Sequence, residues 1–542
     1  MKDEYDQNLC TDKGGGYSMK MLSPERMARY DEYAIKTWGI PSAVLMENAG
    51  RNTYRLMKEK YLNGARQIAV VCGRGNNGGD GFVIARYSLA DGYKTKVYLL
   101  CRGEELKGDA ALNMKLYTSL GGEVIECDNN PKIVKEGLKD ADIIVDAIFG
   151  TGLSKEVKGK ERITIEEINR SGKPVIAVDI PSGIDGTRGV PLGVAVKAMH
   201  TFTYGYPKPG HIIYPGADHT GKLTVIDISI PSIAENEIGI DGHIVDGEMV
   251  RGFLRPRLSW SHKGTYGHAA VIAGSIGKTG AAHMTSLAAL KIGAGLVTLA
   301  VPESLNTIME VKLTEVMTYP VEDKGKGCFL LSSFKKLVDF IENKDVIIIG
   351  PGLSQFGETM EIVRKLFTEV KKSFVIDADG INAFQGHLTL LGKAKGEAVL
   401  TPHPGELARI MGTTPQDVNA DRMGIGAKFV EKYGVNLLLK GARSILFTTD
   451  GGVFINPTGN PALAKGGSGD ILTGFIGGLA AQGYTLAQST IIGAYLHGYM
   501  ADRWTEQKGD TDLQASDLLD GTGRIIKDIQ GGEERTYIEK SL

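Results

Sequence analysis

Short, nearly continuous apolar runs recur along this chain, and each is followed by a glycine-rich or acidic segment and then by a helical pattern. Residues 67–72 and 142–148 are such runs in the first half, and residues 268–273 and 346–350 are such runs in the second. Strands that are apolar on both faces belong to parallel sheets covered by helices on each side. The chain is therefore predicted to be α/β, with ligands bound at the carboxyl ends of the strands.

The length of 542 residues exceeds what one hydrophobic core usually organises, so two large domains are expected. Proline and mixed charge interrupt the pattern between residues 231 and 262. We place a disordered leader at residues 1–19, a first domain at 20–240 and a second at 241–535. The acidic and basic residues at 533–540 are expected to be solvated surface. Ser23 followed by Pro24 predicts the start of the first helix.

Composition excludes several classes of protein. The formal net charge of −2 argues against a nucleic-acid partner. No run reaches the roughly 18 apolar residues of a membrane helix, and the first twenty residues lack a secretory signal, so neither membrane nor export is expected. The five cysteines form no CxxC pair, which fits a reduced, cytoplasmic protein without a disulfide framework or zinc site.

Three segments of the first domain follow apolar strands. GRGNNGGDG (73–81) is expected to be a turn that opens a helix at residues 82–90, with glycine N–H groups facing an anion. The segments at 146–159 and 179–186 begin with Asp146 and Asp179. A single such segment is often only a turn or a helix cap, but three at successive strand ends favour a ligand site. Asn77, Asp146 and Ser182 offer oxygen ligands to an alkali or alkaline-earth cation.

The second domain carries the sharper signal, GNPALAKGGSGDILTG at 459–474. Backbone N–H groups of its glycines are predicted to form an anion hole at a helix start, with Asp470 beside it. A carboxylate there can take a proton from a hydroxyl while a phosphoryl group is transferred to that hydroxyl. TPHPGE (401–406) holds His403 on a rigid loop, and Lys440 to Ser444 offer a cation, a glycine and a hydroxyl to a phosphate.

These motifs resemble a known family. MENAG, GNNGGDG, DAIFGTGLS, VDIPSGIDG and TFTYGYPKPG resemble the NAD(P)H-hydrate epimerase domain. HKGTYG, GPGL, DADGIN, TPHPGE, KGA and GNPALAKGGSGD resemble the ADP/ATP-dependent NAD(P)H-hydrate dehydratase, a ribokinase-like fold. The resemblance covers residues 20 to 530 and implies a bifunctional metabolite-repair enzyme with a Rossmann-like three-layer first domain. It would interconvert the R and S forms of hydrated NADH and NADPH and dehydrate the S form with ADP.

The resemblance also implies roles for individual residues. Asp179 and Asp470 are the expected catalytic groups. The epimerase substrate site is expected to comprise Asn76, Asn77, Gly78, Gly79, Asp80, Gly150, Thr151, Gly152, Leu153, Ser154, Lys155, Glu156 and Asp179. The dehydratase substrate site is expected to comprise Ala281, Gly352, His403 and Asp470. The adenine-nucleotide site is expected to comprise Lys440, Gly441, Ala442, Arg443, Ser444 and Gly469. The potassium ligands are expected to be Asn77, Asp146 and Ser182.

Cofactors and rival functions complete the expectations. K⁺ is expected in the epimerase domain, Mg²⁺ in the dehydratase domain and ADP as co-substrate, with ATP as the alternative; a homo-oligomer is expected. Two rivals stay open. One is a small-molecule kinase, which would release a stable phosphorylated product. The other is a non-catalytic scaffold in the first half, against which the carboxylates Asp146 and Asp179 and the lack of a basic patch argue.

Overall fold

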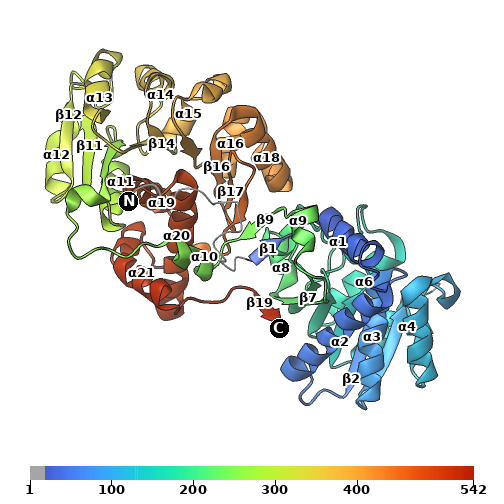
Figure 1. Ribbon diagram of the computed structural model, residues 1–542. Helices are drawn as coiled ribbons and strands as arrows, with labels where there is room; N and C mark the ends of the chain where they lie inside the picture. The colour runs from blue at the N-terminus through green and yellow to red at the C-terminus, as the bar shows by residue number, and fades with distance from the viewer. Residues whose placement is uncertain (1–18, 129, 131, 542) are drawn as a thin grey trace. The chain divides into compact units, whose positions relative to one another are not determined.

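The computed structural model describes residues 19–128, 130 and 132–541, and the chain divides into two compact units (Figure 1). The first unit comprises residues 20–242 and the final residues from 538 onward. The second comprises residues 243–537 and Met19. Apart from Met19, the predicted leader lies outside the described residues. The domain boundaries drawn from the sequence left the last residues unassigned, so the return of the chain end to the first unit is new information.

The first unit is built on an eight-stranded sheet in which all paired neighbours are parallel. Side chains of β2 alternate between two apolar cores: Ile68, Val70 and Cys72 enter one, and Ala69 and Val71 enter the other. The sheet is therefore covered on both faces, as its apolar runs predicted. In spatial order its strands are β19 (Glu539–Ser541), β8 (Lys222–Ile226), β7 (His200–Tyr204), β6 (Val175–Val178), β5 (Ile143–Ala147), β2 (Gln67–Cys72), β3 (Lys94–Leu99) and β4 (Glu123–Glu126).

Helices flank this sheet, and the first begins where the sequence predicted. The Ser23 hydroxyl accepts a hydrogen bond from the Arg26 N–H at 3.3 Å, and Pro24 occupies the first helical position. The helices are α1 (Pro24–Lys36), α2 (Ser42–Tyr61), α3 (Asn76–Ala90), α4 (Gly108–Ser119), α5 (Lys132–Lys139), α6 (Gly159–Arg170), α7 (Pro209–Ile212), α8 (Gly216–Thr220) and α9 (Ala234–Ile238).

One expectation for this unit was wrong. The expected turn at residues 76–81 is the beginning of α3, which starts six residues before Phe82. Its glycines allow close packing: a Cβ on Gly78 would lie 2.0 Å from the Gly73 carbonyl oxygen, and one on Gly79 would lie 2.6 Å from the Met46 sulfur. The charged residues of the chain end are mostly exposed, as expected, but β19 was not expected: it pairs with β8, where Glu539 accepts hydrogen bonds from Thr224 and Lys60.

The second unit contains most of an eleven-stranded sheet that is parallel from β10 to β16, while β17 is antiparallel to both of its neighbours. The strands expected from the apolar runs are all present; β9, β12, β17 and β18 were not expected. In spatial order the strands are β1 (Met19–Met21), β9 (Gly242–Ile244), β18 (Val453–Ile455), β17 (Ile445–Phe447), β16 (Asn436–Leu439), β15 (Ala398–Leu400), β14 (Ser373–Ile376), β13 (Val346–Ile349), β10 (His268–Ile272), β11 (Leu296–Pro302) and β12 (Met317–Val321).

Two helices lie at the centre of this unit. Ile471 and Phe475 of α19 and Ala288 of α11 enter the same buried core, and a Cβ on Gly474 would lie 2.4 Å from the Thr285 carbonyl oxygen. The helices of the second unit are α10 (Gly247–Phe253), α11 (Thr279–Lys291), α12 (Asn306–Lys312), α13 (Phe334–Ile341), α14 (Gly357–Glu369), α15 (Asp379–Asn382), α16 (Pro404–Met411), α17 (Pro415–Ala420), α18 (Arg422–Tyr433), α19 (Ser468–Ala481), α20 (Leu486–Lys508) and α21 (Thr522–Gly531).

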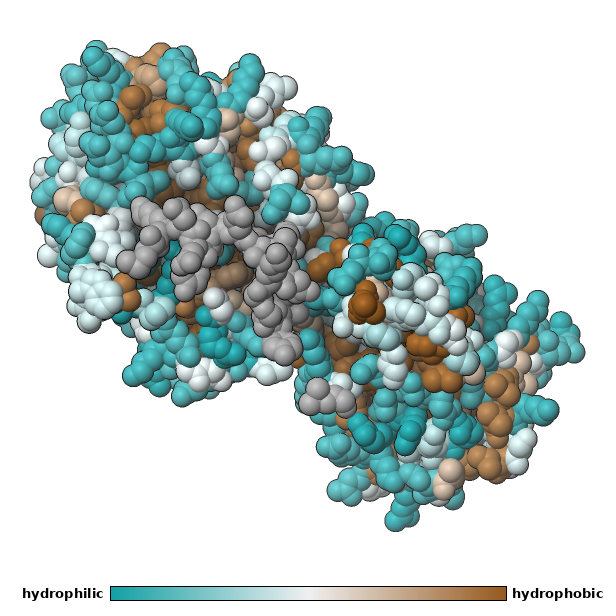
Figure 2. Space-filling model, in the orientation of Figure 1, coloured by the Kyte–Doolittle hydropathy of each residue, from teal (hydrophilic) through white to brown (hydrophobic). Residues whose placement is uncertain are grey.

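The face shown in Figure 2 is mainly hydrophilic, with hydrophobic residues in scattered groups. None of the helices in the described part of the chain has both the length and the apolar character needed to cross a bilayer.

Candidate active sites

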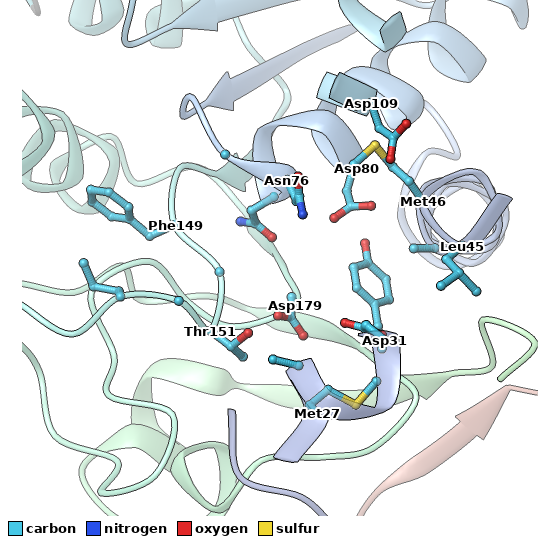
Figure 3. A pocket seen from close by; sticks show the side chains of 18 of the residues that line it. Met27, Asp31, Leu45, Met46, Asn76, Asp80, Asp109, Phe149, Thr151 and Asp179 are labelled. Carbon is cyan, nitrogen blue, oxygen red and sulfur yellow. The ribbon is translucent and has the colours of Figure 1, made fainter. Parts of the chain in front are cut away.

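A cavity of about 640 Å³ lies in the first unit at the carboxyl ends of β2, β5 and β6 (Figure 3). It is enclosed by α1, α2, the start of α3, the loop that follows β5 and the loop that follows β6. The structure brings most of the predicted epimerase residues to this cavity. Those that line it are Asn76, Asn77, Asp80, Gly150, Thr151, Gly152, Leu153, Ser154, Lys155 and Asp179.

Three predicted residues do not line the cavity. Gly78 and Gly79 are buried within the first turns of α3, where they allow the helix to approach its neighbours. Glu156 lies outside the lining, and its carboxylate pairs with Lys158 at 3.0 Å on the exposed surface. Their positions therefore give Gly78 and Gly79 a packing role.

Asp179 is one half of a buried ion pair. It follows β6 directly, and its Oδ1 accepts hydrogen bonds from Lys208 Nζ at 2.7 Å and from the Thr203 hydroxyl at 3.1 Å. Burial opposes ionisation of this carboxyl, but Lys208 outweighs it, so the pKa of Asp179 is below its ordinary value. The Lys208 side chain is 1% exposed and the Asp179 side chain 13% exposed. The pair therefore presents an ionised carboxylate to the cavity.

Asp146 and Ser182 form a second buried cluster beside this cavity. The Ser182 hydroxyl donates to Asp146 Oδ1 at 2.6 Å, and the Ser182 N–H donates to Asp146 Oδ2 at 2.8 Å. Both this cluster and Asn77 lie against the loop that follows β5: the Phe149 N–H donates to the Ser182 hydroxyl at 2.9 Å, and a Cβ on Gly150 would be 3.4 Å from Asn77 Oδ1. Both polar atoms of the Asn77 amide are buried without a hydrogen-bond partner in the described structure. A buried, unsatisfied amide oxygen and a buried carboxylate against the same loop suit a cation ligand set.

In the second unit the glycine-rich motif is a helix start, as predicted. Gly467 adopts φ +93°, and α19 begins at Ser468. A Cβ on Gly469 would lie 3.3 Å from Lys440 Nζ, so the lysine reaches the first turn of this helix. Asp470 lies in that turn, and its carboxyl accepts no hydrogen bond from the described residues. The structure therefore brings Lys440, Gly469 and Asp470 together at a positive helix end.

Lys440 is held by a carboxylate that sequence reasoning missed. Asp377 follows β14, and its Oδ1 accepts a hydrogen bond from Lys440 Nζ at 2.7 Å. The hydroxyls of Thr401 and Thr473 donate to the same carboxylate at 2.8 and 2.6 Å. The signal was present, because DADGIN places Asp377 at a strand end, but its partner lies 63 residues away in the sequence.

Asp470 has the electrostatics of a proton acceptor near neutral pH. Burial, followed by the neighbouring Asp377 carboxylate, raises the pKa of Asp470 to about 7, and Lys440 counteracts them. A general base works best when its pKa is close to the working pH. Asp470 is thus suited to take a proton from a hydroxyl beside the anion hole.

The other predicted residues of this unit belong to the expected hydrate site or to the expected nucleotide site. A Cβ on Gly352 would lie 3.0 Å from the Ala281 Cβ, so these two positions are adjacent. His403 caps α16, where its Nδ1 accepts from the Gly405 N–H at 3.0 Å, and its side chain stays half exposed. The predicted nucleotide segment follows β16: Gly441 and Arg443 adopt positive φ, and the Ser444 hydroxyl donates to the Gly441 carbonyl at 3.1 Å.

The two sites together define the class of this protein. Each unit carries a buried lysine–aspartate pair and a glycine-rich helix start at the carboxyl ends of its parallel strands. These are features of an α/β enzyme with two separate sites for phosphate-bearing ligands.

Comparison with known proteins narrows the class to a family. Residues 42–210 match the family model described as YjeF-related protein N-terminus, and residues 269–522 match the model described as NAD(P)H-hydrate dehydratase. The bifunctional NAD(P)H-hydrate repair enzyme of Moorella thermoacetica is 39% identical over 94% of this chain and 97% of its own length. The Escherichia coli enzyme of the same name is 32% identical over 92% of both chains.

A solved structure resembles the second half alone. The ADP/ATP-dependent NAD(P)H-hydrate dehydratase from Bacillus subtilis, co-crystallised with ATP and Mg²⁺, is 32% identical, covers 53% of this chain and 98% of its own, and has a TM-score of 0.47. The chain belongs to the family of bifunctional NAD(P)H-hydrate repair enzymes, on the strength of the full-length relatives. The predicted family and the predicted class of two α/β domains are confirmed.

Proposed function

We propose that this protein interconverts the R and S forms of hydrated NADH and NADPH in its first unit and dehydrates the S form in its second. The observation that carries the dehydratase proposal is the unpartnered Asp470 carboxyl beside Lys440 and the first turn of α19. A site of this kind suits phosphoryl transfer to a substrate hydroxyl. A family model matches each half, and a bifunctional relative aligns with 94% of the chain, which supports the two activities in one chain.

Dehydration needs help because hydroxide is a poor leaving group. In the proposed reaction Asp470 takes the proton of the C6 hydroxyl while the terminal phosphoryl group of ADP is transferred to that oxygen, leaving AMP. Lys440 and the N–H groups at the start of α19 stabilise the charge on the transferred group. Phosphate then leaves C6 as the ring nitrogen supplies its electron pair, and loss of a proton from C5 restores NAD(P)H.

Within this unit we assign two ligands to the predicted residues. The segment from Lys440 to Ser444, with Gly469, binds the adenine nucleotide, which we take to be ADP. Ala281, Gly352, His403 and Asp470 bind the hydrate.

Mg²⁺ is proposed to accompany the nucleotide phosphates. Magnesium at such sites is held by substrate phosphates and one or two carboxylates. Glu406 fits this use: its Oε2 accepts from the His403 N–H at 2.9 Å, while the nearest described partner of its Oε1 is His403 Nε2 at 3.6 Å. When bound, the ion would offset charge on the phosphates.

In the first unit Asn76, Asp80, the loop of residues 150–156 and Asp179 are proposed to bind the hydrate. Asn77, Asp146 and Ser182 are proposed to hold K⁺. The unsatisfied Asn77 amide and the buried Asp146 carboxylate support a cation there. One carboxylate among three ligands suits a monovalent ion better than a tight divalent one. When bound, K⁺ would fix the loop that follows β5 against the cavity.

The substrates are intracellular metabolites, so we place the activity in the cytoplasm. The expected homo-oligomer stays a prediction, which sedimentation of the purified protein measures.

The test is to mix purified protein with hydrated NADH and ADP and to follow the NADH absorbance band and free phosphate together. We expect both to rise in equal amounts. A small-molecule kinase would instead accumulate a phosphorylated product, without NADH or free phosphate. Absence of NADH formation from the pure S form, with the protein folded, would refute the dehydratase proposal.

A further inference from the structure

Asp31 lies on the cavity face of α1, where its carboxylate forms no structural hydrogen bond or ion pair with the described residues. The buried residues Met27, Tyr30 and Ala34 mark the inward face of this helix, and Asp31 lies four residues after Met27, within that face. Both Met27 and Asp31 line the cavity (Figure 3). Asp31 precedes residues 42–210, the part that the family model matches, and no site residue was predicted from α1.

The Asp31 carboxylate lacks a compensating partner. It accepts no hydrogen bond and forms no ion pair among the described residues. The nearby Lys208 cannot serve it, because its three ammonium protons go to Asp179, to Thr203 and to the Tyr204 carbonyl, at 2.7, 2.9 and 3.2 Å. An unpaired, partly buried carboxylate destabilises a fold. Its presence beside a cavity therefore points to chemistry rather than to packing.

Three of the four carboxyls that line the cavity, those of Asp31, Asp80 and Asp179, have pKa values shifted by their surroundings. Lys208 keeps Asp179 ionised, with its pKa below the ordinary value. Burial, together with the neighbouring Asp179 and Asp31, raises the pKa of Asp80 well above its ordinary value, which favours its protonated form. Burial raises the pKa of Asp31 to about 6, against the opposing effect of Lys208. Groups whose environments push their pKa values apart are suited to divide acid and base roles.

We propose that Asp31 is the proton acceptor of the epimerase reaction. This rests on the proposed function of the first unit. The hydrate is a hemiaminal at C6. Asp31 takes the proton of the C6 hydroxyl, the C6–N1 bond breaks to give an open-chain aldehyde, and N1 takes a proton from Asp80. Rotation of the aldehyde followed by attack of N1 on its other face re-forms the C6–N1 bond. The protons return to Asp80 and to the new hydroxyl, and the configuration at C6 is inverted.

The assignment makes a prediction for pH. The titratable and charged groups that line the cavity together with Asp31 are Arg74, Asp80 from α3, Asp109 from α4, Lys155, Asp179 after β6, Tyr204 from β7 and Lys208 before α7. Asp31, whose pKa is about 6, is expected to change its charge in this range. The epimerase kcat/KM should therefore fall as the pH drops below about 6, because the acceptor becomes protonated.

The experiment uses the full-length protein with Asp31→Asn, and Glu32→Gln as the matched control. Glu32 is the next residue of the same helix, but it is exposed and pairs with Lys36. Interconversion of pure R and S hydrate is followed by chromatography without ADP, and dehydration of the S form is followed separately. Asp31→Asn should lose about 10²–10⁴-fold in epimerase rate and the acid limb near pH 6, while dehydration stays unchanged. Glu32→Gln should behave as the wild type.

The outcomes separate the two proposals. A wild-type protein that does not interconvert the hydrates refutes the epimerase function itself. An active wild type, together with an Asp31→Asn variant of normal rate and unchanged pH profile, overturns the role of Asp31. A slow Asp31→Asn variant that keeps the acid limb also overturns it, because the limb then belongs to another group. Circular dichroism and retained dehydration establish that the variant is folded.

Discussion

The two units present opposite charges to their ligands through the same kind of ion pair. In the first unit, the Lys208 side chain is buried, with 1% of it exposed, and Asp179 faces the cavity. In the second unit, the Asp377 side chain is buried, with 2% of it exposed. The Lys440 side chain is 16% exposed and faces the start of α19. Lys208 donates all three of its protons, whereas Lys440 has one hydrogen bond in the described structure. The first arrangement presents a fixed negative charge to the cavity, and the second presents a positive charge that suits binding of a phosphate.

The comparison shows which member of a buried lysine–aspartate pair acts on the ligand. In both units the aspartate follows a central parallel strand, β6 or β14, so the strands place the pairs similarly. What distinguishes them is which partner remains exposed.

The largest effect is expected at Asp470. Asp470→Asn removes the proton acceptor beside the anion hole and should lower the dehydration rate by about 10²–10⁴-fold. Interconversion of the hydrates should not change. The measurement is NADH formation from pure S hydrate with ADP, and the matched control is Asp520→Asn, an exposed aspartate of the same unit. Near-normal turnover of Asp470→Asn would remove Asp470 from the mechanism.

Asp470→Asn should also stabilise the protein. A carboxyl whose pKa rises on folding, here to about 7, destabilises the folded state progressively as the pH increases from the unfolded value toward 7, and this cost is complete above it. The amide does not ionise, so the melting midpoint at pH 8 should exceed that of the wild type. A lower midpoint would show that the Asp470 carboxylate is needed for folding.

The next effect concerns the two lysines. Lys440→Met should weaken ADP binding by roughly 10–100-fold, because a hydrogen bond to a charged group contributes about 1.5–3 kcal/mol. Lys208→Met should leave ADP binding unchanged and destabilise the first unit by about 3–5 kcal/mol, since it leaves a buried carboxylate without its partner. Calorimetric titration and chemical denaturation measure the two effects. Equal loss of ADP affinity in both variants would contradict the assignment of nucleotide binding to Lys440 alone of the two lysines.

How far the sequence alone anticipates these sites depends on the range of the interaction. The strand ends carrying Asp146, Asp179 and Lys440 follow from apolar runs, which are local. The start of α3 at Asn76 did not, because glycines that allow close packing look the same in sequence as glycines of a turn. The Asp377–Lys440 pair and the pairing of β19 with β8 join segments far apart in the sequence, so local patterns did not predict them. Asp31 was not predicted because its helix has an ordinary amphipathic pattern.

A smaller effect separates the two sites by pH. The kcat/KM for dehydration should fall below about pH 7, because Asp470 must be ionised in the presence of Asp377, Lys440 and Glu406. Interconversion should persist to about pH 6, the range of Asp31. Parallel pH profiles on pure S hydrate measure both limbs. Coincident limbs would indicate a shared step, such as substrate binding, rather than two separate groups.

The smallest expected effect is that of the cation. Potassium should raise the melting midpoint of the first unit by a few degrees relative to lithium, as ligands that bind only the folded state do. Asn77→Ala should remove this difference. Asn113→Ala, at a buried asparagine whose amide already donates to the Asp109 carbonyl, should retain it. Equal midpoints of the wild type in the two salts would argue against a potassium site.

The central claim is that each unit performs its own reaction, and one complementation measurement tests it directly. Asp179→Asn protein is given an equal mixture of R and S hydrate with excess ADP, and NADH formation is followed. The reaction should stop after the S form is consumed, apart from slow spontaneous interconversion. Adding Asp470→Asn protein should restart it, because the R form can diffuse to an intact epimerase site. Loss of dehydration in folded Asp179→Asn protein, or failure of the second variant to restart the reaction, would contradict the account.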